Sequence, residues 1–268
     1  MPSDARAYGW DIKDGAFDWS IFSGHLTKEL DRLEDIYRGL LKNSGVETFD
    51  QRARIVDPHT IELADGTRKS AKHILIATGG RPVRPEVPGA QCGIVSDDIF
   101  HLETLPKSVL IIGGGFIACE FACILHGLGV EVTQYYRGAQ ILRGFDDEAR
   151  GLIADSMRER GINLHTGTNI AEARPAAEAQ GDGMIAPVEA AHTGGPWEKS
   201  VDGPVWVKAT NGQAEVFDQV LFATGRRPNT DDMGLEEVGV TLGRGGQVLV
   251  DGYSQTNIPS IFAIGDVT

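Results

Sequence analysis

Three consecutive glycines, Gly113, Gly114 and Gly115, are the residues of this chain that most clearly predict ligand chemistry. They follow the apolar run 109–112, which has the length and composition of a strand buried on both faces. Together with Ala118 they form the pattern G-x-G-x-x-A. Glycines at these positions permit a tight turn and let the backbone approach a pyrophosphate, whose negative charge faces a helix N-terminus. The pattern therefore predicts a dinucleotide site.

The segments around the glycines supply the helix and the second strand that this motif requires. Residues 116–128 carry apolar side chains at helical spacing, and Gly129 stands where a helix-terminating glycine is expected. Residues 130–136 are predicted to form the second strand. A glycine-rich turn in another kind of α/β protein is the alternative, and the complete strand–helix–strand context favours the nucleotide site.

The end of the second predicted strand indicates which nucleotide binds. A site for NAD carries an acidic residue about 20 residues beyond the glycines, where it holds the ribose 2′-hydroxyl. This chain has Gln134, Tyr135 and Tyr136 there, followed by Arg137 and then by Arg143. Either arginine alone would be an ordinary surface charge. Two guanidinium groups without a carboxylate, however, favour the 2′-phosphate of NADP.

Length and composition describe an ordinary globular protein. The chain has 268 residues, a formal net charge of −13 and three cysteines. The negative charge argues against a nucleic-acid partner or an anionic membrane surface, and no apolar run approaches the ~18 residues of a membrane span. Three cysteines make no disulfide framework and the N-terminus has no signal-peptide character, so we expect a cytoplasmic protein.

The remaining segments predict an α/β chain that alternates strands with helices. Residues 1–22 are expected to be irregular, and the Ala-, Gly- and Pro-rich residues 171–203 to form a long insertion without secondary structure. Proline-rich residues 81–89 mark a domain boundary. Helices are predicted at 25–43 and 147–160, and strands at 46–50, 52–57, 60–63, 72–77, 162–164, 205–209, 214–217, 220–223 and 261–264.

Two of these strands are followed by nearly the same residues. KHILIATGGRP at 72–82 and QVLFATGRRPN at 219–229 both place Ala-Thr-Gly, then arginine and proline, after an apolar run. Ligands of α/β sheets bind beyond the carboxyl ends of the strands. Both copies of this Ala-Thr-Gly repeat are therefore expected at binding sites.

Four motifs in order, ILIATGGRP, GGGFIACEFACILHGLGVEVT, LFATGRRPNT and IFAIGDVT, resemble the flavoprotein disulfide reductases. Within them the chain is most similar to the glutathione-disulfide reductases, apart from residues 171–203. The resemblance implies an α/β fold in which a Rossmann-like NADP-binding domain, 81–227, is inserted into a partial FAD-binding domain made of 1–80 and 228–268. It also implies NADP(H) and FAD as cofactors, glutathione disulfide as the substrate of the complete enzyme, and a homodimer.

The resemblance also implies cofactor contacts, residue by residue. The nicotinamide nucleotide would be contacted by the fingerprint and the second copy of the repeat: Gly113, Gly114, Gly115, Ile117, Ala118, Glu120, Arg137, Arg143, Gly225 and Arg226. FAD would be contacted by Ala53, Thr78, Gly79 and Asp266. Tyr37 would line the glutathione cleft, and Phe116 replaces the family tyrosine that covers the nicotinamide pocket.

Several features of the family are missing, and we expect this chain to be the central piece of a reductase without catalytic residues of its own. It lacks the first FAD fingerprint, the C-x-x-x-x-C redox pair, the lysine partner of Glu120 and the domain that supplies a His–Glu pair. Cys119 and Cys123 are expected to be packed apolar thiols, and Cys92 to stand alone in a loop. The histidines show no metal-binding spacing, and His126 is expected to be structural.

Three functions remain open at this point. The first is a glutathione-disulfide reductase, of which this chain would be an inactive part. The second is a relative of lipoamide dehydrogenase or mercuric reductase, although the arginine pair argues against an NAD-dependent lipoamide dehydrogenase. The third is a non-catalytic module that binds NADPH.

Overall fold

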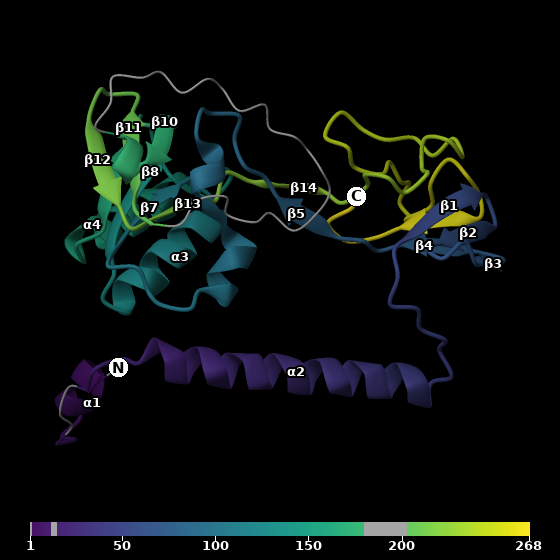
Figure 1. The fold of residues 1–268 in the computed structure, drawn as a ribbon, viewed down its shortest axis with the longest axis horizontal. Helices are drawn as coiled ribbons and strands as arrows, with labels where there is room; N and C mark the ends of the chain where they lie inside the picture. The colour runs from purple at the N-terminus through teal and green to yellow at the C-terminus, as the bar shows by residue number, and fades with distance from the viewer. Residues whose placement is uncertain (1, 12–14, 180–202) are drawn as a thin grey trace. The chain divides into compact units, whose positions relative to one another are not determined.

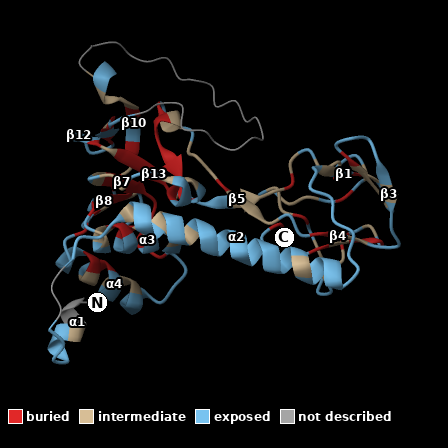
Figure 2. Ribbon diagram, turned by 60° about the horizontal axis from the view of Figure 1, so that its bottom comes forward, coloured by how far each residue is buried: buried red, intermediate tan, exposed pale blue. Residues whose placement is uncertain are grey.

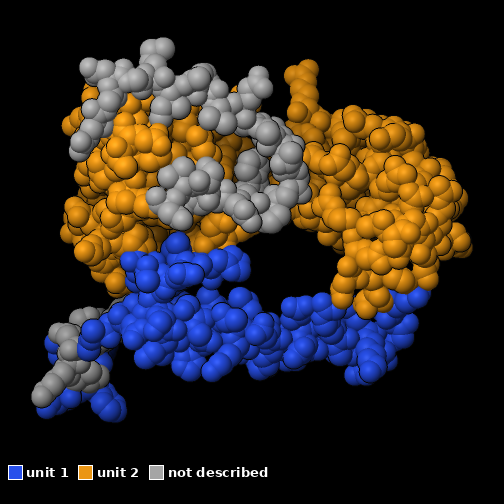
Figure 3. Space-filling model, in the orientation of Figure 1, with its two compact units in different colours: residues 1–47, 100–105 blue, residues 48–99, 106–268 orange. Residues whose placement is uncertain are grey.

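The computed structural model describes residues 2–11, 15–179 and 203–268. The chain divides into two compact units (Figure 3). The first unit comprises residues 1–47 and 100–105, and the second comprises 48–99 and 106–268. Within the described residues, no helix combines the length and the apolar character that crossing a bilayer requires.

The first unit contains the helices α1 (Pro2–Ala7) and α2 (Trp19–Asn43). The prediction that residues 1–22 are irregular was therefore wrong for 2–7 and 19–22, and it is confirmed for the described residues between these helices. Helix α2 begins earlier than predicted because Asp18 caps it. The Asp18 carboxylate accepts a hydrogen bond from the backbone N–H of Ser20 at 2.9 Å. None of the residues of α2 is buried, as its pale colour in Figure 2 shows.

A parallel five-stranded sheet forms one part of the second unit (Figure 1). Its strands, in spatial order, are β6 (Ile94–Val95), β13 (Gln219–Phe222), β7 (Ser108–Ile112), β8 (Glu131–Tyr136) and β9 (Asn163–Thr166). The apolar side chains 109–112 of the central strand β7 are at most 2% exposed. The prediction of a strand buried on both faces is therefore confirmed, because β7 has sheet neighbours and covering layers on every side.

Two helices contact this sheet. Helix α3 (Phe116–Gly127) packs against β7 and β8, and α4 (Asp147–Glu159) contacts β9. Gly129 has φ of +91° just beyond α3, as expected of a glycine that ends a helix. The Nε2 atom of His126 lies 2.7 Å from the carbonyl oxygen of Arg160, which links the C-terminal ends of the two helices.

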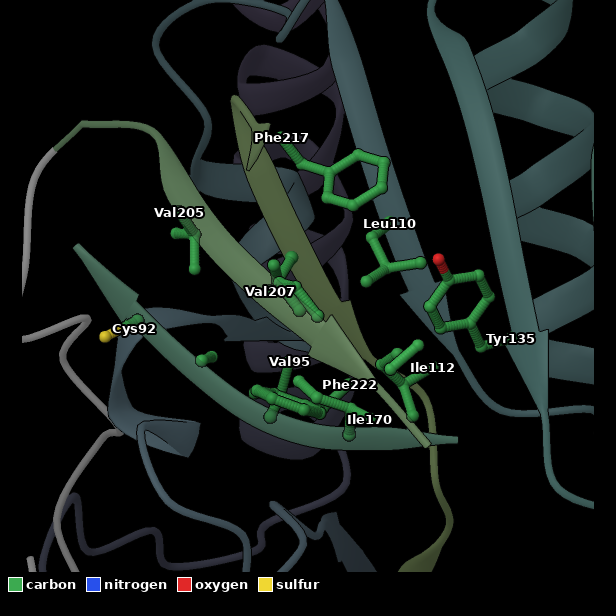
Figure 4. Close-up of a cluster of buried hydrophobic side chains, with 13 residues drawn as sticks. Cys92, Val95, Leu110, Ile112, Tyr135, Ile170, Val205, Val207, Phe217 and Phe222 are labelled. Carbon is green, nitrogen blue, oxygen red and sulfur yellow. The ribbon is translucent and has the colours of Figure 1, made fainter. Parts of the chain in front are cut away.

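A smaller antiparallel sheet packs on the large one: β10 (Ile170–Pro175), β11 (Val205–Ala209) and β12 (Ala214–Phe217). Figure 4 shows apolar side chains of both sheets meeting in one core: Leu110, Ile112, Tyr135, Ile170, Val205, Val207, Phe217 and Phe222. Strand β10 corrects the prediction that residues 171–203 have no secondary structure, since its pairing with β11 decides its conformation. Residues 180–202 of that segment lie outside the described residues.

The other part of the second unit is built from short strands. An antiparallel meander contains β1 (Ala53–Asp57), β2 (Thr60–Leu63) and β3 (Arg68–Ser70), and β4 (Ile74–Ile76) pairs in parallel with β15 (Ile261–Ala263). A turn at Asp65-Gly66 joins β2 to β3, and Gly66 has φ of +83°. The strand predicted at 46–50 is absent, because those residues are exposed and pair with no described strand.

The two copies of the Ala-Thr-Gly repeat bond to each other. The residues that follow them form an antiparallel pair, β5 (Gly80–Pro82) and β14 (Arg226–Pro228). The Thr78 hydroxyl donates a hydrogen bond to Asn229 O, and the Thr224 hydroxyl donates one to Val83 O, both at 2.8 Å. We call these two reciprocal bonds the threonine clasp. The clasp brings together segments that are about 150 residues apart, and nothing in either copy alone predicts it.

Candidate functional site

The fingerprint glycines form the loop between β7 and α3. Gly113 has φ of +144°, which side chains rarely allow, and a Cβ atom there would lie 2.2 Å from Ala223 O. A Cβ atom on Gly114 would lie 2.3 Å from Cγ of Tyr136. At Gly115, by contrast, a Cβ atom would meet no other protein atom within 4 Å. The loop is thus packed tightly against the protein on one side and borders open space on the other.

A cavity of about 870 Å³ lies beside this loop. Most of the predicted nucleotide contacts form its wall: Gly113, Gly114, Gly115, Ile117, Arg137, Arg143, Gly225 and Arg226. The structure therefore brings the fingerprint, both arginines and the second copy of the repeat to one site. The volume falls in the range of about 300–1,000 Å³ that is usual for cofactor sites.

Two predicted contacts lie on α3 outside the wall of this cavity. Ala118 is fully buried, and its Cβ atom would lie 3.3 Å from a Cβ atom on Gly113. A small residue at this position lets the helix come close to the loop. Glu120 is exposed. Phe116, the residue that replaces the family tyrosine, does line the cavity and is 55% exposed.

The arginines give this cavity a positive end. Arg137 and Arg143 are exposed, and neither forms a salt bridge with any residue that the structure describes. No carboxylate belongs to the described wall of the cavity. Guanidinium groups pair with phosphate through charge-assisted hydrogen bonds, so this end can hold a phosphate that NAD lacks.

Arg226 lies in a different electrostatic setting from the first two arginines. Its Nη2 atom donates a hydrogen bond to Gly80 O at 2.5 Å, and its Nη1 atom is 3.6 Å from the Asp97 carboxylate. Its Nε atom is 4.0 Å from the carboxylate of Asp266, a predicted flavin contact. The structure thus places one residue predicted for the nicotinamide side beside one predicted for the flavin side.

The two tyrosines of the wall, Tyr135 and Tyr136, were not among the predicted contacts. Tyr136 lies against Gly114, and a Cβ atom on Gly138 would lie 2.6 Å from Cε1 of the same ring. One signal in the sequence could have indicated Tyr136. Side chains alternate along a strand, so residues 134 and 136 lie on the same face. The cavity also includes Thr224, which belongs to the second copy of the Ala-Thr-Gly repeat, and Asn169, which no motif indicated.

A second cavity, of about 490 Å³, lies among the short strands. Of the predicted flavin contacts, Ala53 and Thr78 line it, whereas Gly79 and Asp266 do not. Its wall is largely apolar and includes the side chains of Ile55, Ile61, Ile74, Leu75, Ile76 and Met233. It also includes three cations, Arg52, Arg54 and Lys69. An apolar pocket with nearby cations can take a planar ring that carries phosphate groups.

The predicted substrate contact, Tyr37, belongs to the first unit, where it lies on α2 and is 65% exposed. The walls of the two cavities consist of residues of the second unit, and Tyr37 belongs to neither wall.

None of the three cysteines forms a disulfide with another described residue, and the three have different surroundings. Burial raises the pKa of the Cys119 thiol, which keeps it protonated and unreactive. Cys123 is exposed, so the prediction of two packed thiols was wrong for this residue, which lies on the outer face of α3. The prediction that Cys92 stands in a loop was also wrong. It ends a short 3₁₀ helix and is 1% exposed in the core of Figure 4.

Comparison with known proteins agrees with this geometry. A family model described as pyridine nucleotide-disulphide oxidoreductase matches residues 7–268. The chain is 42% identical over 265 residues to a glutathione reductase of Burkholderia cepacia and 42% identical over 266 residues to the chloroplastic/mitochondrial glutathione reductase of Pisum sativum. It is 36% identical over 273 residues to a thioredoxin reductase of Emiliania huxleyi.

Each of these matches takes in 99% of this chain, but only 53%, 44% and 50% of the respective relative. The chain spans about half the length of the curated relatives that it matches.

Proposed function

This chain belongs to the pyridine nucleotide-disulphide oxidoreductases, and we propose that it is the NADPH-binding part of a glutathione-disulfide reductase. Glutathione reductases of this family work with FAD and NADPH. Two glutathione reductases are each 42% identical to this chain, whereas the thioredoxin reductase is 36% identical. This difference supports glutathione disulfide as the substrate rather than thioredoxin.

The observation that carries the proposal is the cavity beside the glycine loop. Its wall combines a loop against which a pyrophosphate can lie with Arg137 and Arg143, and no described carboxylate competes for these guanidinium groups. The residues therefore fit NADPH, with its pyrophosphate near Gly115 at the start of α3 and its 2′-phosphate on the two arginines.

We further propose that the second cavity receives the adenosine part of FAD. Ala53 and the apolar side chains around it suit the adenine ring, and the three cations of the wall suit the adjoining phosphates. Quenching of FAD fluorescence on titration with the chain tests this assignment. Replacement of Ala53 by tryptophan would fill the cavity and should weaken the quenching, and an unchanged affinity would contradict the assignment.

In the complete enzyme the reaction would transfer two electrons from NADPH to glutathione disulfide. NADPH and one proton reduce one molecule of glutathione disulfide to two molecules of glutathione, and the S–S bond breaks. Bound FAD supplies the redox chemistry between the nicotinamide and the disulfide. The residues of this chain hold and orient the nucleotide: the loop and α3 bind the pyrophosphate, and the arginines bind the 2′-phosphate.

The proposed domain division follows the threonine clasp. Residues 81–227 would form the NADP-binding domain, and 1–80 with 228–268 would form the FAD-binding domain. Strands β5 and β14 then lie where the chain passes from one domain to the other. We place the protein in the cytoplasm, where thiols stay reduced, because none of its three cysteines forms a disulfide in the part of the chain that the structure describes. Cell fractionation with an antibody against the chain checks the location.

Calorimetric titration of the chain with NADPH and NADH tests the nucleotide site. The chain should prefer NADPH, and Arg143→Ala should weaken NADPH binding by about ten- to a hundredfold, because hydrogen bonds to charged groups contribute ~1.5–3 kcal/mol. NADH binding should hardly change. Arg244→Ala is the matched control, since Arg244 is exposed and lies outside the cavity wall. Equal losses for both nucleotides would overturn the phosphate assignment.

The substrate is tested on the full product of the coding sequence that contains residues 1–268. NADPH oxidation that depends on glutathione disulfide would support the reductase. Oxidation with thioredoxin, lipoamide or mercuric ion but not with glutathione disulfide would transfer the chain to another branch of the family. NADPH binding without oxidation of any kind would favour the non-catalytic module.

A further inference from the structure

One buried polar side chain lies directly under the glycine loop. Gln134, in the middle of β8, is 0% exposed among residues that are mostly apolar. Its Nε2 atom donates a hydrogen bond to the carbonyl oxygen of Gly113 at 2.9 Å and lies 3.7 Å from the Sγ atom of Cys119. Its Oε1 atom accepts no hydrogen bond from any residue that the structure describes.

The bond to Gly113 also orients the neighbouring N–H group. The Gly113 carbonyl and the Gly114 N–H belong to one peptide unit, and none of the described peptide bonds is cis. In a trans peptide these two groups point in opposite directions. Because Gln134 holds the carbonyl toward the protein interior, the Gly114 N–H points away from the interior, on the side where the cavity lies.

Two further contacts hold the same stretch of loop. The Leu142 N–H donates a hydrogen bond to Gly114 O at 2.6 Å, and the Tyr136 ring lies against Gly114. The Gly113 N–H donates to Tyr135 O at 2.9 Å, which extends the pairing of β7 with β8. The loop backbone is therefore anchored on its protein side, and its remaining donors are available to a ligand.

The orientation of the Gln134 amide cannot be reversed. If the amide turned over, Oε1 would face the carbonyl oxygen of Gly113, and two acceptors would oppose each other. In the observed orientation a buried acceptor is left without a partner, which destabilises the folded state. An apolar side chain of similar size would remove this unpaired acceptor but would leave the Gly113 carbonyl without its donor. Because these two costs offset each other, the amide is better explained by its action on the loop than by fold stability.

From these contacts we infer that Gln134 is a positioning residue for the nucleotide: it aims the Gly114 N–H at the pyrophosphate. This inference rests on the proposed NADPH site and adds a specific role to a residue that does not touch the ligand. Because the pyrophosphate is common to NADPH and NADH, the contribution of Gln134 must be the same for both nucleotides. That property separates it from Arg143, whose contribution depends on the 2′-phosphate.

The test is titration of the unmodified chain and of Gln134→Leu with NADPH and with NADH, together with the melting temperature of each protein. Loss of one neutral hydrogen bond that positions a donor should weaken both nucleotides equally, by about three- to tenfold. The melting temperature should change little, because removal of the unpaired Oε1 offsets the loss of the donor to the Gly113 carbonyl. A purely structural role would instead lower the melting temperature.

Controls make the result decisive. Thr133→Val removes a buried hydroxyl from the neighbouring position of β8, on the opposite face, and should leave both affinities unchanged. Gln134→Met replaces Gln134→Leu if the leucine variant does not fold. If the Gln134 variant bound both nucleotides as tightly as the unmodified chain, or lost affinity for NADPH only, the inference about Gln134 would be overturned and the proposed site would stand. Failure of the unmodified chain to bind either nucleotide would overturn the proposed site, and the inference with it.

Discussion

The two copies of the Ala-Thr-Gly repeat have similar sequences but different surroundings. Strand β13, which precedes the second copy, lies between β6 and β7, and its Leu221 is 0% exposed. Strand β4, which precedes the first copy, pairs with β15 in a sheet of two described strands. Leu75 occupies the same place in the repeat as Leu221 but is 57% exposed. The strand predicted at 72–77 is therefore present as β4 but is only partly buried.

The difference shows that burial depends on the neighbours of a strand and not on its own composition. The nucleotide region, which we define as residues 83–225, has apolar layers on both faces of its large sheet. The flavin-side region, residues 48–80 and 228–268, has its core on one face of β4, where Ile76 packs with Ile261 and Ala263. We expect the first region to resist local opening more strongly than the second.

The largest expected difference comes from truncating the two matched leucines. Leu221→Ala should lower the free energy of unfolding by about 2–5 kcal/mol, because it leaves a cavity between packed layers. Leu75→Ala should lower it by less than about 1 kcal/mol, because more than half of that side chain already contacts solvent. Urea unfolding measures both values. Similar losses would mean that the two strands are equally covered in solution.

The glycines of the repeat offer a second matched pair. Gly79 has φ of +68°, close to the left-handed α region, whereas Gly225 has φ of +143°, which is open to glycine alone. Neither position would bring a new Cβ atom within 4 Å of another residue, so backbone strain is the main effect. Gly225→Ala should cost about 2–3 kcal/mol and Gly79→Ala about 1 kcal/mol. Thermal unfolding of both variants checks this order, and a larger loss at Gly79 would contradict it.

The two threonines of the clasp should contribute equally to the free energy of unfolding, whereas the two matched leucines should not. Thr78→Val and Thr224→Val each remove one 2.8 Å hydrogen bond to the other copy, and each should cost about 0.5–1 kcal/mol. Thr241→Val, at an exposed threonine outside the clasp, is the control. Urea unfolding gives the three values. A much larger loss from one of the clasp variants would show that the two bonds are not equivalent.

The smallest expected effects concern the thiols, which all lie in the nucleotide region. Iodoacetamide should label exposed Cys123 quickly and should reach Cys92 and Cys119 only when this region opens. Mass spectrometry of each labelled peptide measures the rates. Rapid labelling of Cys92 under native conditions would show that the nucleotide region is not the more stable of the two.

Burial also makes Cys119 a source of pH dependence. Its pKa is raised in the folded protein, so the folded thiol stays protonated at a pH where the unfolded thiol has already ionised. Its contribution to stability is complete below the unfolded pKa and is lost as the pH rises through the folded pKa. The free energy of unfolding should therefore fall as the pH rises above the ordinary cysteine pKa of about 8.5, and less steeply in Cys119→Ala. An identical slope in the variant would contradict this assignment.

The sequence predicted the parts of the site that depend on local pattern. The glycines, the helix after them and the arginines were recognised because a turn, a helix stripe and a charge are properties of neighbouring residues. The helix start at Asp18 and the strand 170–175 were missed. The first depends on a single capping side chain, and the second on pairing with β11, which lies beyond residues 180–202 in the chain.

By itself, then, the sequence predicted a dinucleotide loop, which the structure contains, and a preference for the 2′-phosphate of NADP, which stays a prediction. The tertiary structure alone decided what supports that loop. Gln134 reaches the carbonyl of Gly113 across 21 positions of sequence, and Arg226 lies beside Asp266 only because β14 pairs with β5. Such contacts form only when particular strands become neighbours. The order of the strands is the one that gives the whole packed core its lowest free energy, and a local sequence pattern does not contain that information.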